Sequence, residues 1–220
     1  MQGMTAKGRL ILYLSAALAA GLAAASTLLL APGIGPGPGD AADDAAMVGT
    51  VLPEPRPLPA VSLTDHHGAP WTPADDLTGR WQFVFFGFTH CPDVCPMTLA
   101  TLAGTLERLD AATARPEVVF ISVDPQRDTP AAMADYVSHF HDAFIGVSGE
   151  RDQIDRLTEA LGIAYTLHAP DENGDYAVDH SAAILLIDPQ GRLRALWQPP
   201  HGRAVLAEEF QRIRARFGPT

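Results

Sequence analysis

The sequence predicts an α/β domain with a thioredoxin-like fold, and three observations lead to this prediction. Apolar runs typical of buried strands alternate with helical patterns over residues 58–220. The last two apolar runs, 181–187 and 192–198, are joined by a short turn and indicate a hairpin, after which a helix follows. Cys91 and Cys95, the only two cysteines, lie where the first long strand meets the first long helix.

A short hairpin is expected at the entrance to this domain. Residues 61–63 alternate in polarity, residues 64–68 have the composition of a turn, and residues 69–72 fit a returning strand. A second turn at 76–80 then leads into strand 81–88, whose apolar centre is typical of a buried strand.

The later elements follow from apolar periodicity and from Pro and Gly at the expected ends. Asp128 or Thr129 is expected to cap the helix that begins at Pro130. Gly162 is expected to end a later helix, 150–161. The predicted elements after the cysteines are helix 96–112, strand 117–123, helix 130–140, strand 144–147, helix 150–161, strand 181–187, turn 188–191, strand 192–198 and helix 203–217.

The segment before the domain predicts a membrane anchor and a tether. Residues 10–31 carry no charge and are long enough to span a bilayer core of about 30 Å. Two basic residues precede them, so we expect 1–31 to form a cytoplasmic stub and a transmembrane helix. A cleaved signal peptide is the alternative, although its apolar region is usually shorter. Residues 32–57 are rich in Pro and Gly and favour an extended tether.

The expected localisation is therefore that of a single-pass protein of the inner (cytoplasmic) membrane, with residues 58–220 on the periplasmic side. The net charge is −11, and residues 32–220 carry 13 basic and 26 acidic residues. A domain this acidic is a poor nucleic-acid binder. Two cysteines provide neither a disulfide framework nor a zinc finger, and their close spacing indicates one local site.

The cysteines occupy the stretch from Gly87 to Pro96, between a buried strand and a helix. A helix N-terminus presents unpaired N–H groups and a positive dipole end, so thiols there are expected to ionise easily. We expect the two Cα atoms within disulfide range, which makes an oxidised Cys91–Cys95 pair feasible. A purely structural disulfide is less favoured, because so short a loop removes little entropy from the unfolded chain.

The choice between redox enzyme and metal site depends on the residue that faces the thiols. Thioredoxin-type enzymes have two residues between their cysteines, and this chain has three. Those enzymes also carry a cis-proline in the loop before the terminal hairpin, where this chain has His180. Two thiolates and an imidazole form a soft site with few ligands, which favours copper, especially Cu(I), whereas zinc prefers a fourth ligand.

At these residues the chain resembles the Sco/SenC family of copper-binding assembly factors for cytochrome c oxidase. The resemblance extends over about residues 58–218, and its three motifs are 86–96, 123–130 and 176–181. It implies a thioredoxin-like fold and copper, as Cu(I) and in some states Cu(II), bound by Cys91, Cys95 and His180. It also implies delivery of that copper to the binuclear copper centre of the oxidase, which makes the copper-bearing subunit the expected partner.

Three carboxylates are candidates for supporting the site. Asp124 ends the strand beside the cysteine strand, Asp179 adjoins His180 and could fix its tautomer, and Asp93 could cap the turn. Met97 and Met133 are expected to fill the core, and Arg127 is expected to pair with its neighbour Asp128. His90, beside Cys91, could lower the pKa of that thiol when protonated or could face water. The other histidines outside the site are expected to be solvated; these are His66, His67, His139, His141, His168 and His201.

The sequence thus favours a membrane-anchored copper metallochaperone rather than an enzyme. The main alternative is a thiol–disulfide oxidoreductase that keeps cysteines of the oxidase or of a copper protein reduced; it needs the same cysteines but not His180. A redox or copper sensor is the third interpretation, although the chain shows no fused output domain. Other periplasmic copper chaperones and thiol–disulfide proteins are further expected partners.

Overall fold

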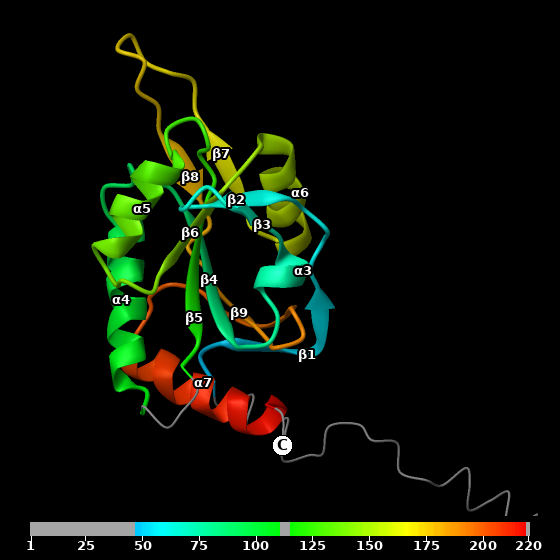
Figure 1. Cartoon of the computed structure of the whole chain (residues 1–220). Coiled ribbons are helices and arrows are strands. Elements are labelled where there is room, and N and C mark those ends of the chain that lie inside the picture. The colour runs from blue at the N-terminus through cyan, green and yellow to red at the C-terminus, as the bar shows by residue number, and fades with distance from the viewer. Residues whose placement is uncertain (1–46, 111–114, 219–220) are drawn as a thin grey trace, which may run out of the picture. The chain divides into compact units, whose positions relative to one another are not determined.

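The structure is a computed structural model, and it describes residues 47–110 and 115–218 (Figure 1). The predicted anchor and most of the predicted tether, residues 1–46, lie outside the described residues. Among the described residues, no helix is long and apolar enough to cross a membrane. The described residues belong to one compact unit.

An eight-stranded sheet forms the centre of this unit. Its strands are β1 (Thr50–Pro57), β2 (Leu63–Asp65), β3 (Pro70–Trp71), β4 (Gln82–Gly87), β5 (Glu117–Ser122), β6 (Ile145–Ser148), β9 (Ile184–Ile187) and β10 (Arg192–Trp197). Their order across the sheet is β1-β10-β9-β4-β5-β6-β2-β3. A separate two-stranded sheet consists of β7 (Tyr165–Leu167) and β8 (Val178–His180).

The helices are α3 (Pro73–Asp76), α4 (Val94–Arg108), α5 (Pro130–Ser138), α6 (Arg151–Leu161) and α7 (Arg203–Phe217). Figure 1 shows α4 and α5 on one side of the central strands, α6 on the other, and α7 across the lower end, where it contacts α4. The order of strand, helix, strand, terminal hairpin and terminal helix confirms the predicted thioredoxin-like fold. The entrance hairpin is also confirmed, since β2 pairs with β3 and then with β6.

The middle of the sheet is apolar because β4 is covered on both faces. Residues 83–86 are at most 1% exposed. β4 pairs parallel with β5 and antiparallel with β9, so its backbone groups are satisfied on both sides. A continuous apolar run is what a strand in such a position requires, and it ends at Gly87, just before the cysteine loop.

The predicted tether was wrong for residues 50–57, which form β1. This strand lies at the edge of the sheet and pairs only with β10. An edge strand tolerates proline because one of its sides needs no ladder hydrogen bonds. The register shifts between Val51 and Arg56, where Pro53 and Pro55 lie. Proline-rich composition therefore did not exclude a strand here.

Helix boundaries differ from the predictions by a few residues. The first long helix begins at Val94 rather than Pro96, and Pro96 lies in its first turn, where a backbone N–H has no intrahelical partner. Thr129 caps α5, as predicted, because its hydroxyl accepts a hydrogen bond from Ala132 N at 3.3 Å. Gly162 ends α6 in the left-handed conformation with φ of 72°, which glycine adopts without steric cost.

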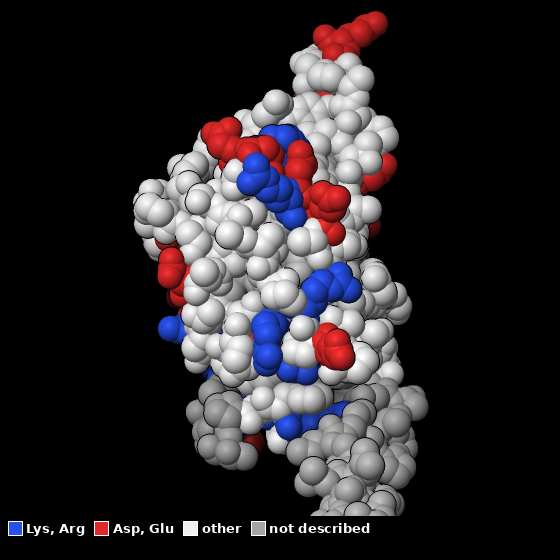
Figure 2. Space-filling model, turned by 90° about the vertical axis from the view of Figure 1, so that its right-hand side faces the viewer, with Lys and Arg blue, Asp and Glu red and all other residues white. Residues whose placement is uncertain are grey.

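Between the predicted helix 150–161 and the predicted strand 181–187, the structure contains two strands that were not predicted. β7 and β8 are three residues each and are joined by the loop 168–177, whose turn is exposed. Figure 2 shows acidic side chains at the upper end of the molecule, where this loop projects, and most arginines on that face lie lower. On this face, arginines also lie among the acidic side chains of the upper part.

Candidate metal centre

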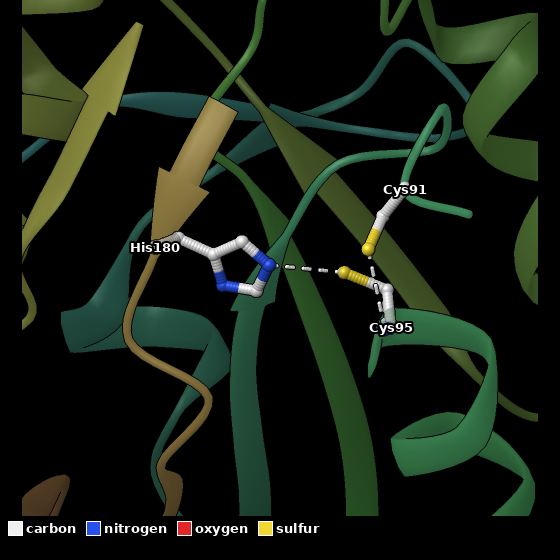
Figure 3. Close-up of side chains that lie close together, drawn as sticks. All are labelled: Cys91, Cys95 and His180. Atoms are coloured by element: carbon white, nitrogen blue, oxygen red, sulfur yellow. Dashed lines mark hydrogen bonds between the residues drawn. The ribbon is translucent and has the colours of Figure 1, made fainter. Parts of the chain in front are cut away.

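Cys91, Cys95 and His180 come together at the end of β4 (Figure 3). Cys91 lies in the loop after β4, Cys95 in the first turn of α4, and His180 at the end of β8. The two Sγ atoms and a ring nitrogen of the histidine all lie within 4.8 Å of one another. Both cysteines are free thiols in the structure, so the expected disulfide stays a prediction.

The close approach of the thiols to the sheet depends on Gly87. A Cβ atom at this position would lie 2.6 Å from Cys95 Sγ and 2.8 Å from Cε2 of Phe120. Both distances are shorter than a real Cβ contact. Only a glycine leaves room for the sulfur above the end of β4, and a glycine directly after a buried run was the sequence signal for this requirement.

The loop that carries Cys91 is held by Asp128. This carboxylate is buried and accepts hydrogen bonds from Thr89 N at 3.0 Å, Thr89 Oγ1 at 2.6 Å and Ser122 Oγ at 2.5 Å. The predicted Arg127–Asp128 ion pair was wrong, because Arg127 pairs with Asp124 instead. Sequence reasoning therefore missed Asp128 as the residue that fixes the cysteine loop.

The tautomer of His180 is set by a backbone carbonyl. Nδ1 lies 3.0 Å from Ser181 O, and a carbonyl can only accept, so Nδ1 carries the proton. Nε2 then presents its lone pair, 3.2 Å from Cys95 Sγ. Burial lowers the pKa of His180, although the Ser181 hydrogen bond and the charge of Asp179 oppose this shift. The neutral imidazole is therefore the form that faces the thiol near pH 7.

The expectation that both thiols ionise easily was wrong for Cys95. Its side chain is completely buried, and burial raises the pKa of the thiol despite a hydrogen bond from the backbone at Phe88. Cys91 is partly exposed, and its Sγ accepts a hydrogen bond from Cys95 N at 3.4 Å. The apo site thus pairs a protonated Cys95 thiol with a neutral imidazole, and a bound metal would have to displace that proton.

Two aromatic rings, one on β4 and one directly after it, pack against the imidazole. The ring centroids of Phe85 and Phe88 lie 6.1 and 5.8 Å from that of His180, both in edge-on geometry. Such contacts restrict the rotation of the imidazole. Because β7 and β8 are not hydrogen-bonded to the main sheet, these rings are part of what places the histidine over the thiols.

The three carboxylates proposed from sequence have different surroundings. Asp93 occupies the N-cap position of α4 but makes no side-chain capping bond. Asp179 is exposed and accepts from Nε2 of His168 at 2.7 Å, so it does not hold Nδ1 of His180 as predicted. Asp124 is buried and accepts from Tyr176 Oη at 2.6 Å and from Arg127. It thus supports the histidine segment rather than the cysteine loop.

The structure confirms some of the other expectations for methionines and histidines and contradicts others. Met133 is buried in the core, as predicted, but Met97 is 58% exposed one turn after the cysteine loop. His201 was expected to be solvated and is half-buried instead, with Nε2 at 2.8 Å from Ala182 O. His90 is largely exposed and lies 3.0 Å from Thr89 Oγ1 through Nδ1.

Similar known proteins fall in one family. The family model described as SCO1/SenC matches residues 57–215. The mouse (Mus musculus) mitochondrial SCO2 homolog is 43% identical over 151 residues, which is 68% of this chain and 57% of the mouse protein. The match thus covers less than two thirds of that relative.

Solved structures with copper bound share the fold. ScoI of Bradyrhizobium japonicum with copper bound is 34% identical, with a TM-score of 0.64 over 71% of this chain and 99% of that one. ScoI of Arabidopsis thaliana with copper bound is 31% identical, with a TM-score of 0.68 over 73% of this chain and 99% of that one. From the family model and these likenesses, we conclude that the chain belongs to the SCO1/SenC family.

Proposed function

We propose that this protein binds copper through Sγ of Cys91, Sγ of Cys95 and Nε2 of His180. The observation that carries the proposal is the convergence of these three atoms, from two separate parts of the chain, within 4.8 Å. The copper-bound ScoI structures supply independent support, because they share both fold and family with this chain.

The donor set favours copper over the commoner divalent metals. Two thiolates and one imidazole are soft ligands, and three of them match the low coordination number of Cu(I). A structural zinc site needs four ligands, and among the described residues the cluster contains three His, Cys, Asp or Glu side chains. We therefore expect Cu(I) as the principal cargo, with Cu(II) as a second state.

The unequal exposure of the three proposed ligands is compatible with transfer of the metal to a partner protein. Cys95 is completely buried, whereas Cys91 and His180 are each partly exposed. A partner can thus reach the metal from the side of the loop and of β8 without unfolding α4. We propose that the protein delivers copper to the binuclear centre of cytochrome c oxidase during assembly, with the copper-bearing subunit as recipient, from a domain held on the periplasmic face by residues 1–31.

The oxidation state of the cysteines would then control loading. Oxidation of the two thiols to a Cys91–Cys95 disulfide releases two electrons and two protons and removes both sulfur ligands. Copper binding therefore requires a reductant upstream, and a thiol–disulfide protein is a natural second partner.

A thiol–disulfide oxidoreductase is the second candidate, and one observation favours it. The partly exposed Cys91 sulfur, which accepts a hydrogen bond from Cys95 N, is the accessible attacking group, and the buried Cys95 is placed to act as the resolving thiol. This function uses both cysteines but does not need His180.

Titration of Cu(I) into the reduced full-length protein in detergent, against a competing chelator, tests the proposal. We expect Cys91→Ser and Cys95→Ser to abolish tight binding and His180→Ala to weaken it by about tenfold or more, the loss of one metal ligand. His168→Ala is the matched control, because this histidine directly follows β7 and its ring contacts the exposed carboxylate of Asp179. Unchanged affinity in all three site variants would refute the assignment. Turnover of a mixed-disulfide substrate that survives His180→Ala would favour the enzyme.

A further inference from the structure

The histidine ligand sits on a hairpin that the main sheet does not hold. β7 and β8 pair only with each other, although β8 carries His180. The proposed site therefore needs side-chain contacts that fix this hairpin against the cysteine loop. Arg127, in the loop between β5 and α5, provides a group of such contacts.

Arg127 binds Tyr176, in the segment just before β8. Its Nη1 donates a hydrogen bond to the Tyr176 carbonyl oxygen at 3.1 Å, and its guanidinium lies 3.8 Å from the centroid of the Tyr176 ring. Its Nε pairs with Asp124, which also accepts a hydrogen bond from Tyr176 Oη at 2.6 Å. Tyr176 is thus held through its ring, its hydroxyl and its backbone.

The same guanidinium faces the cysteine side of the site. Arg127 lies 5.6 Å from the centroid of the Phe88 ring, and Phe88 leads directly into the cysteine loop. Phe88 also contacts His180, at 5.8 Å between ring centroids. Arg127 therefore lies between the two chain segments that carry the ligands and contacts both.

We propose that Arg127 is a positioning residue that latches the β7–β8 hairpin, and with it His180, over the two thiols. This inference rests on the proposed copper site and deepens it. When the latch is intact, copper has three protein ligands. When the latch opens, the hairpin moves away with the imidazole, and copper is left on two sulfurs, from which a recipient can take it.

The contacts require an arginine. A guanidinium is planar and can stack on a ring while its N–H groups donate in different directions, whereas a lysine ammonium keeps the charge but neither the stacking nor the fork of donors. Cation–π contacts and hydrogen bonds to charged groups each contribute enough that losing both should raise the open population about tenfold or more.

The first test measures the rate at which an excess of a colorimetric Cu(I) chelator removes copper from the loaded full-length protein. We expect Arg127→Gln to release copper about tenfold faster than the wild type, with Arg127→Lys also faster. Arg156→Gln is the matched control; it makes the same charge change on an exposed arginine of α6 and should leave the rate within about twofold. Equal rates for wild type, Arg127→Gln and Arg127→Lys would overturn the proposal.

A double-mutant cycle separates positioning from a general loss of stability. Because Arg127 acts through the histidine, Arg127→Gln should not accelerate copper release further when His180 is already alanine. Additive effects of the two substitutions would contradict the latch.

Hydrogen exchange of the apo protein provides a readout that does not need copper. Arg127→Gln should speed exchange over residues 165–181, including the Ser181 amide that donates to Ala164 O, but not in β4 and β5. Uniform acceleration, or none, would refute the latch. If the wild type binds no copper while this local effect is present, the proposed function fails and the latch stands.

Discussion

Substitution of Gly87 by alanine tests whether the metal centre depends on the close packing of Cys95 against the end of β4. The added Cβ would lie 2.6 Å from Cys95 Sγ, whereas ordinary contact begins at 3.4 Å, so the sulfur must move by about 0.8 Å or the backbone must yield. Metal–ligand distances tolerate deviations of only about 0.2 Å. The displaced sulfur therefore cannot keep its place in a three-ligand site.

We expect Gly87→Ala to weaken Cu(I) binding by about tenfold or more, and to lower the free energy of unfolding by about 1–3 kcal/mol through overpacking. Competition titration measures the first and urea denaturation the second. Gly104→Ala is the matched control, because its Cβ would also meet an atom at 2.6 Å, but that atom is Cδ of the exposed and flexible Arg203. Wild-type copper affinity in Gly87→Ala would refute this account of how Cys95 is placed.

Four further predictions follow from the surroundings of the three site residues. Because burial raises the pKa of Cys95, copper must displace at least this one proton, and Cu(I) affinity should rise by about tenfold or more per pH unit between pH 6.5 and 9.0; a flat profile would contradict a protonated thiol. Because burial lowers the pKa of His180, the unfolded state binds a proton at this imidazole more readily than the folded state does. The metal-free protein should therefore lose stability as pH falls below 6.5. His180→Ala should reduce this loss, as measured by denaturant titrations at several pH values. Asp128→Asn should cost about 2–3 kcal/mol of stability in urea denaturation, because its carboxylate accepts three buried or part-buried hydrogen bonds, and a cost below 0.5 kcal/mol would refute that role. Asp179→Asn should change copper affinity less than about threefold, because this carboxylate contacts His168; a tenfold loss would show that it, and not the Ser181 carbonyl, sets the tautomer.

The convergence of Cys91, Cys95 and His180 could be predicted because chain order, as well as local motifs, places them together. Cys91 and Cys95 follow a buried strand, and the loop before the terminal hairpin of this fold faces that position. His180 lies 85 residues beyond Cys95 and is nonetheless in contact with it. Once the fold was identified from alternating strands and helices, this long-range contact followed from topology.

The ionisation of Cys95 could not be predicted from its place at a helix N-terminus. A helix dipole stabilises a nearby charge by about 0.3–1 kcal/mol, whereas complete burial can shift a pKa by several units. Burial is a property of the assembled domain, in which β4, α4 and β8 enclose the sulfur. The helix dipole favours a lower pKa for the Cys95 thiol, but burial, which raises that pKa, has the larger effect.

The supporting residues were missed for a related reason. Asp124 and Asp128 both follow β5, and the sequence alone does not show which one turns toward the cysteine loop. In the structure the more distant Asp128 binds Thr89, whereas Asp124 binds Arg127 and Tyr176. The carboxyl ends of two adjacent parallel strands bring these groups together, and side-chain direction within the connecting loop decides their partners.

X-ray absorption at the copper edge tests the central claim most directly. Full-length reduced protein loaded with one equivalent of Cu(I) should show two sulfur ligands and one imidazole nitrogen, and His180→Ala should remove the nitrogen while keeping the sulfurs. A site with sulfur ligands alone in the wild type, or a nitrogen signal that persists in His180→Ala, would contradict a copper centre made of Cys91, Cys95 and His180.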